Sequence, residues 1–308
     1  MTDQRNFRST YLEKVGIKGV EEKKSLEILL KEQPLDISKL MQFCLRFPVP
    51  TIYRPFLWKV LLGILPPQSQ SHEFVWDQRC QQHNDLREAL FSTRRVTENT
   101  PLSQVHLCMY LIDDGILPFD QSKMFEEPSH QIFIAISTAV CQIIEDETEV
   151  YWMTRQYYRL LDKQQELLPI MREKVEIFVK REDTEGKLYN HLKKLQAFNL
   201  LPLDFWFQTA YASVLPENSF ERIWDKIIGG SCKILIYVAV SILTTFKRPI
   251  LSMNSMDEVN RYLTKIPEDS GDIIVSKATE SWQKQGSLLT PVTGKSESPS
   301  ILERAGST

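Results

Sequence analysis

The chain has 308 residues, of which 42% are hydrophobic and 10% aromatic, so it can build one or two packed domains and is not a disordered chain. Only 11 residues are glycine, and neither G-x-G-x-x-G nor G-x-x-x-x-G-K-[ST] occurs, which argues against a β-sandwich and against nucleotide binding through those loops. The net charge of −3 argues against a general nucleic-acid binder.

Helical periodicity dominates the first half of the chain. Apolar residues recur three and four positions apart, with charged residues between them. Asp36 is a candidate N-cap, and Pro101 suits the first turn of a helix. Helices are expected over residues 21–31, 37–45, 57–65, 72–94, 101–112 and 131–145.

The second half shows the same periodicity, with a break at Pro169 and a candidate N-cap at Asn218 or Ser219. Helices are expected over residues 151–161, 173–180, 185–197, 203–214, 219–228, 234–246, 257–263 and 271–285. The predicted fold class is therefore all-α. Residues 286–308 are rich in Ser, Thr, Gly and Pro and are expected to form a disordered tail.

The longest apolar segment, residues 234–246, is shorter than the ~20 residues that span a bilayer, and we interpret it as a buried core helix. The first ten residues are polar and do not resemble a signal peptide. The five cysteines are widely spaced, which fits neither a disulfide framework nor a zinc site. We expect a cytoplasmic protein whose membrane association, if any, comes through partners.

No local pattern of catalytic or metal-binding residues is found. The five histidines form no H-E-x-x-H motif, and no G-x-S-x-G motif occurs. We therefore expect no catalytic residues, no metal and no cofactor.

Three segments carry a more specific signal. The first is Arg54–Gly63, with the pattern R-x-x-x-W-x-x-L-L-G, and the second is Val150–Trp152. The third runs from Leu203–Phe207 to Arg222–Ile228, which contains a Trp-Asp pair. Their order and spacing over residues 45–265 resemble the TBC domain family, two-lobed helical proteins best known as activators of Rab GTPases.

The aromatic residues of these segments also have a structural interpretation. Trp58 and Trp224 lie at helical spacing from apolar residues, so we expect both in the core. Arg54 is expected to pair with a carboxylate, for which Asp225 is one candidate.

The family resemblance implies two catalytic motifs, an arginine finger in I-x-x-D-x-x-R and a glutamine in Y-x-Q-G. The best match to the first motif places Glu88 at the arginine position, where an acid would repel phosphate. Arg87, Arg94 and Arg95 are out of frame with the motif. An open alternative is that one of these three side chains contacts a phosphate. Gln131 falls at the glutamine position, and we interpret it as the polar start of a buried helix.

Residues 5–9, 19–31, 58–67 and 230–235 resemble a non-catalytic branch of the family. That resemblance implies a subunit of the tuberous sclerosis complex, which binds the coiled coil of hamartin. Tuberin, reached through the complex, would supply GTPase activation toward Rheb and so restrain TOR growth signalling at lysosome or vesicle membranes. The alternative is a Rab GTPase activator with residual or non-standard activity.

Two further expectations concern layout. Residues 1–44 are expected to form N-terminal helices packed on a TBC domain of residues 45–285. Val105, Met109 and Ile112 form an i, i+4, i+7 row that a partner helix could contact, and core packing is the alternative explanation of the row.

Overall fold

The structure, a computed structural model, describes residues 20–120 and 122–285, and this part of the chain contains α-helices, short 3-10 helices and no strand. The expected tail of residues 286–308 lies outside it, as does the start of the expected N-terminal unit. The α-helices are α2 (Val20–Leu29), α3 (Ile37–Arg46), α4 (Arg54–Leu61), α5 (His72–Ser92), α6 (Leu102–Asp113), α7 (Pro128–Ile143), α8 (Glu147–Asp162), α9 (Leu168–Glu182), α10 (Lys187–Lys194), α11 (Ala197–Leu200), α12 (Leu203–Gln208), α13 (Glu217–Ile228), α14 (Ile234–Thr245), α15 (Lys247–Ser252), α16 (Met256–Leu263) and α17 (Glu268–Lys284).

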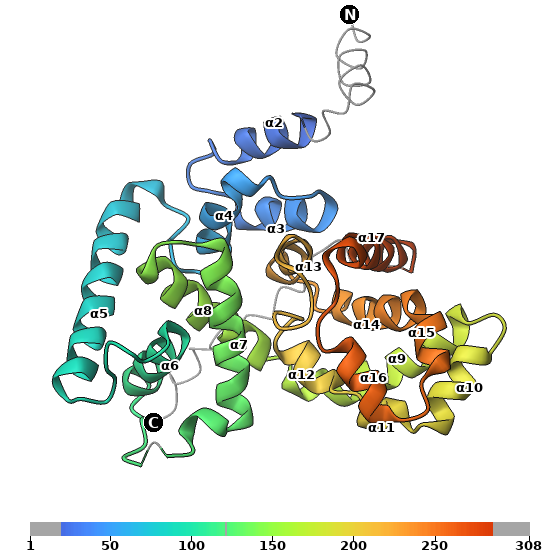
Figure 1. The fold of residues 1–308 in the computed structure, drawn as a ribbon. Coiled ribbons are helices and arrows are strands. Elements are labelled where there is room, and N and C mark those ends of the chain that lie inside the picture. Colours follow the sequence, from blue (N-terminus) through green and yellow to red (C-terminus); the bar gives the residue numbers. More distant parts are fainter. Residues whose placement is uncertain (1–19, 121, 286–308) are drawn as a thin grey trace, which may run out of the picture.

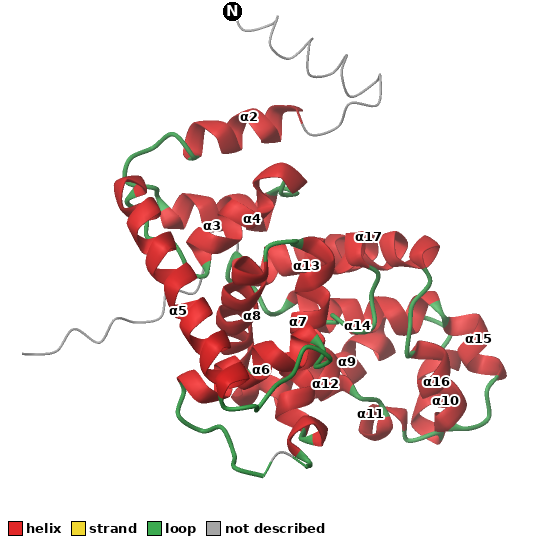
Figure 2. Ribbon diagram, turned by 60° about the vertical axis from the view of Figure 1, so that its left-hand side comes forward, coloured by secondary structure: helices red, strands yellow, loops and turns green. Residues whose placement is uncertain are grey.

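The helices form two lobes, as expected (Figure 1). The first lobe holds α2–α8, with α5 along its outer side, and the second holds α9–α12 and α14–α17 (Figures 1 and 2). Helix α13 joins them, because it packs against α3, α4 and α7 of the first lobe and against α14 and α17 of the second. The all-α prediction is confirmed.

Helix α14 is the centre of the second lobe. Every residue from Ile234 to Leu243 is buried, and the helix packs against α9, α15 and α17. The interpretation of this apolar segment as a core helix is therefore confirmed. Within residues 20–120 and 122–285, no helix is long and apolar enough to cross a bilayer.

A buried ion cluster fastens α4 to α13. The Arg54 guanidinium donates to both carboxylate oxygens of Asp225, from Nε to Oδ1 at 3.1 Å and from Nη2 to Oδ2 at 3.3 Å. Its Nη1 donates to a Glu221 carboxylate oxygen at 2.5 Å. Asp225 Oδ1 also accepts a hydrogen bond from Trp58 Nε1 at 2.9 Å. The expected pairing of Arg54 with Asp225 is present, and Glu221 is a second partner that the sequence did not indicate.

Trp224 lies where the two lobes meet. Its ring centroid is 4.2 Å from that of Tyr157 and 5.9 Å from that of Trp58. Its indole N–H donates to the carbonyl oxygen of Ala210 at 3.0 Å, so its one polar atom is satisfied in the core. Core packing of both tryptophans is thus confirmed.

The helix predicted over residues 203–214 is wrong in extent, and the helix predicted over 185–197 ends early, at Lys194, before the left-handed Gln196 with φ of 54°. Helix α12 ends at Gln208, because Ala210 and Tyr211 adopt left-handed backbone with φ of 46° and 63°. The Tyr211 hydroxyl donates to the carbonyl oxygen of Leu235 at 2.8 Å, a contact that the turn makes possible. Tertiary contacts therefore override the helical periodicity at this point.

Two predicted helix starts had different outcomes. Asp36 is the N-cap of α3 and accepts a hydrogen bond from the backbone N–H of Lys39 at 3.0 Å, as expected. The cap expected at Asn218 or Ser219 is wrong, because α13 begins earlier, directly after Pro216.

Candidate functional site

Glu88, the residue expected at the arginine-finger position, lies on the exposed side of α5. This helix buries only His83 and Leu90, which point to the opposite side, so the sequence folds with Glu88 toward solvent. A carboxylate in that position repels the negative charge of a nucleotide phosphate.

The neighbouring arginines Arg87 and Arg95 are both engaged by the protein itself. Arg87 Nε lies 3.7 Å from a Glu147 carboxylate oxygen, and its guanidinium lies over the Phe91 ring at 4.9 Å. Arg95 Nη1 donates to the carbonyl oxygen of Phe119 at 2.6 Å and so holds the loop that follows α6. Arg87 is thus paired at the exposed surface, and the Arg95 guanidinium is bonded to the loop after α6.

Arg94 differs from its neighbours because it is exposed at the edge of a cavity of about 680 Å³. The residue has a left-handed backbone with φ of 57° and follows the end of α5. The cavity lies between the ends of α5 and α6 and the next loop, where Phe119 is 92% exposed. It is lined by Thr93, Arg94, Arg95, Ile112, Gly115, Leu117 and Phe119.

Gln131 lies in the first turn of α7 and is exposed. Its side-chain amide donates to the carbonyl oxygen of Phe125, and His130 Nδ1 contacts the carbonyl oxygen of Met124 at 2.6 Å. The two side chains therefore tie the turn before α7 to the helix start, which is a structural role. Helix α6 packs against both α5, which carries Glu88, and α7, which carries Gln131 (Figures 1 and 2).

The proposed partner row on α6 faces inward. Val105 is 4% exposed and Met109 is fully buried, so a partner helix could not reach either side chain in this structure. Ile112 is half-buried and lines the cavity beside Arg94. For Val105 and Met109 the partner row is corrected to core packing, the alternative that the spacing left open.

A buried histidine lies next to this row. His106 Nδ1 is 3.0 Å from the Ser137 hydroxyl, and its ring packs against Tyr151 at 5.9 Å. Burial lowers the pKa of His106 to about 3, with a smaller contribution from nearby His83. The imidazole is therefore neutral at physiological pH.

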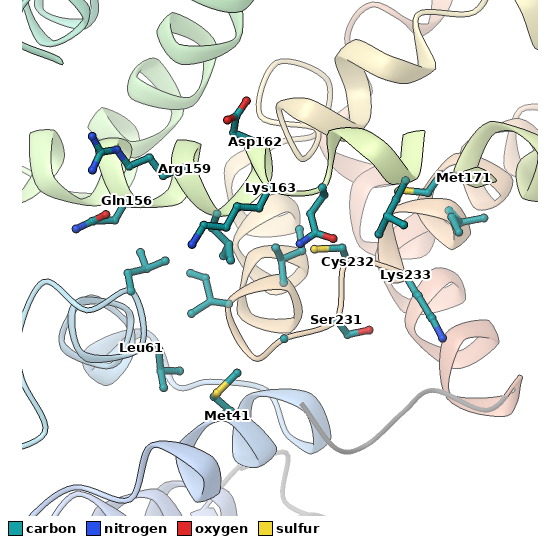
Figure 3. Close-up of a pocket in the computed structure, with 18 of the residues that line it drawn as sticks. Met41, Leu61, Gln156, Arg159, Asp162, Lys163, Met171, Ser231, Cys232 and Lys233 are labelled. Carbon is teal, nitrogen blue, oxygen red and sulfur yellow. The ribbon is translucent and has the colours of Figure 1, made fainter. Parts of the chain in front are cut away.

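The sequence did not indicate a second and larger cavity, of about 880 Å³, where the two lobes meet (Figure 3). Met41 and Leu61 border it from the first lobe, and Met171 and Lys233 from the second. Arg159 and Lys163, near the end of α8, add positive charge to its wall. The residues that line it come from helices and turns that are far apart in the sequence, so no local pattern in the sequence could have identified it.

Comparison with known proteins agrees with this architecture. Residues 133–251 match the family model of the Rab-GTPase-TBC domain. The chain is 47% identical over 282 residues to human TBC1 domain family member 7, an alignment that covers 91% of this chain and 95% of the relative. It is 44% identical over 283 residues to TBC1 domain family member 7 of Xenopus tropicalis, with the same coverage.

Two solved structures share the fold. The Ypt/Rab-GAP domain of Gyp1p superposes with a TM-score of 0.55 at 16% identity, covering 86% of this chain and 98% of that domain. The Chlamydomonas flagellar RabGAP TBC domain superposes with a TM-score of 0.56 at 14% identity, covering 89% and 95%.

Proposed function

Because the chain belongs to the TBC domain family, we propose that it is a non-catalytic subunit of the tuberous sclerosis complex. In this role it binds the coiled coil of hamartin and supports the activation of the Rheb GTPase by tuberin. It thereby restrains TOR growth signalling, and hamartin and tuberin recruit it from the cytoplasm to lysosome or vesicle membranes.

The observation that carries the proposal is the exposed carboxylate of Glu88 at the expected finger position. An arginine finger stabilises the charge that develops on the transferred phosphoryl group, and an acid does the opposite. Arg87 and Arg95, which could have taken over, are held by Glu147 and by the carbonyl oxygen of Phe119. A family member without a finger retains a large helical surface, which suits binding to another protein.

Titration calorimetry with the hamartin coiled coil tests the proposal. We expect saturable binding with a negative heat-capacity change, because apolar surface becomes buried. A companion assay measures GTP hydrolysis by Rheb with the hamartin–tuberin complex, with and without this chain. Absence of binding to the coiled coil at micromolar concentrations would contradict the proposal.

One observation favours the alternative, a Rab GTPase activator with non-standard residues. Arg94 is exposed beside a cavity and follows the end of α5, the helix that carries Glu88. If Arg94 took that role, the purified chain would accelerate GTP hydrolysis by a Rab protein, and Arg94→Ala would abolish the acceleration.

A further inference from the structure

The outward side of α9 carries an exposed row of residues that alternate three and four positions apart. It consists of Leu167, directly before the helix, and Ile170, Lys174, Ile177 and Arg181. We call this row the α9 stripe. Leu167 is 44% exposed, and Ile170 and Ile177 are each 50% exposed. Alternating steps of three and four are the spacing of a coiled-coil seam.

The residues of the α9 stripe are not those that pack α9 against the rest of the protein. Helix α9 has a second row, Met171, Val175 and Val179, which is buried, and the helix packs against α14. Large apolar side chains gathered on the outward side of an already anchored helix indicate an interaction surface.

A groove runs beside the stripe. A cavity of about 500 Å³ lies between α9, the start of α14 and the end of α17, with the buried rings of Tyr237 and Trp282 in its wall. It shares Leu167, Met171, Lys233 and Ile236 with the cavity of about 880 Å³, so the two cavities are adjacent, and we treat them together as one groove beside the stripe.

The described residues that line the two cavities are mostly basic, although the whole chain carries −3, and Asp162 is the one acidic side chain among them. The basic residues are Arg159, Lys163, Lys174, Arg181 and Lys233. Arg159 is paired with Asp114 at 2.5 Å, and Arg181 lies 3.8 Å from Glu182, so the net positive charge of the groove is moderate. Glu166 and Glu173 border the opposite edge of the stripe, so the basic side chains lie on the groove side only. A complementary partner is therefore acidic where it faces the groove.

We infer that the α9 stripe and its groove are the docking surface for an amphipathic helix with a heptad repeat. Its apolar seam packs on Ile170 and Ile177, and its acidic residues face Lys174 and Arg181 across the groove. The inference rests on the proposed function only for the identity of that helix, the hamartin coiled coil.

The test compares the wild-type chain with the Ile170→Asp/Ile177→Asp double variant in titrations against the hamartin coiled coil. Both side chains are half-exposed, so thermal stability should stay close to that of the wild type. Ile273→Asp is the matched control, because Ile273 is a 59% exposed isoleucine on α17. We expect about a hundredfold weaker binding for the double variant and no change for the control. Lys174→Glu should weaken binding about tenfold by reversing a charge in the groove.

A second probe separates this inference from the proposed function. It is a heptad-repeat peptide with Leu at a and d and Glu at e and g, whose like charges oppose its own pairing. If the wild type fails to bind hamartin, the proposed function is wrong, and loss of peptide binding in the double variant still supports the surface.

Three results would overturn the inference. The first is that the double variant binds both probes as the wild type does. The second is a wild-type dimer that the double variant turns into a monomer, which would make a second copy the occupant. The third is that the double variant and truncation after Gln285 lower thermal stability by the same amount. That result would mean that residues 286–308 of the same chain cover the stripe.

Discussion

Replacing Arg54 by Leu should destabilise the protein strongly, because it leaves two carboxylates buried without a cation. Arg54 is 4% exposed, Glu221 7% and Asp225 1%. Lys226 is close but is committed elsewhere, since its ammonium donates to the carbonyl oxygen of Cys44 at 2.6 Å. Breaking a buried pair by removing one partner costs about 3–5 kcal/mol.

The pH dependence of this variant has a definite sign. Burial raises the pKa of both Asp225 and Glu221, and Arg54 opposes that rise. Without Arg54 the folded state binds protons more readily than the unfolded chain, so the variant loses stability as pH rises through the raised pKa values. The difference between variant and wild type should therefore shrink as pH is lowered from about 7 to about 5.

Urea unfolding, followed by tryptophan fluorescence, measures both effects as free energies of unfolding. Arg172→Leu is the control, because Arg172 forms an exposed pair with Asp204 at 3.3 Å, and its loss should cost less than about 1 kcal/mol. The reasoning is refuted if Arg54→Leu costs no more than the control, or if its cost does not depend on pH.

Three further changes have expected outcomes. Gln131→Ala should leave Rheb activation by the assembled complex unchanged in a GTP-hydrolysis assay, and a large loss with intact assembly would show a catalytic role. Gly271→Ala should cost about 1–3 kcal/mol in urea unfolding, because its added carbon would lie 2.5 Å from the Ser219 hydroxyl; an unchanged midpoint would contradict this close packing. His106 has a folded pKa of about 3, below the ~6.5 of the unfolded chain, so its contribution to stability is present above pH ~6.5 and is lost as pH falls toward 3. Between pH ~6.5 and 3 the free energy of unfolding of His106→Gln should fall with pH by about 1.4 kcal/mol per pH unit less than that of the wild type. An equal fall in both proteins would contradict the lowered pKa of His106.

Much of the fold follows from local sequence, because helix periodicity, Asp36 and the apolar segment before Phe246 each specify their structure locally. The end of α12 could not be predicted, since the left-handed turn at Ala210 and Tyr211 depends on contacts with residues more than ten positions away. Local patterns do not report such long-range contacts.

The candidate site was predictable only in part. Pairing of Arg54 with a carboxylate could be anticipated from the chemistry of arginine, with Asp225 as one candidate, but Glu221 could not, because a second carboxylate on one guanidinium depends on the crossing of two helices. The row on α6 and the α9 stripe both consist of residues three and four positions apart, and only packing shows that Met109 is buried while Ile170 is exposed. Periodicity therefore identifies a helix face but does not say whether the protein or a partner covers it.

We propose that this chain binds within a GTPase-activating complex and lacks a finger of its own. Single-turnover GTP hydrolysis by Rheb and by a panel of Rab proteins, with the purified chain at micromolar concentration, tests it most directly. An arginine finger contributes about 10³–10⁵ in rate, so we predict hydrolysis at the rate of each GTPase alone. Stimulation of any of them by about a hundredfold, lost in Arg94→Ala, would contradict the account and establish a Rab GTPase activator.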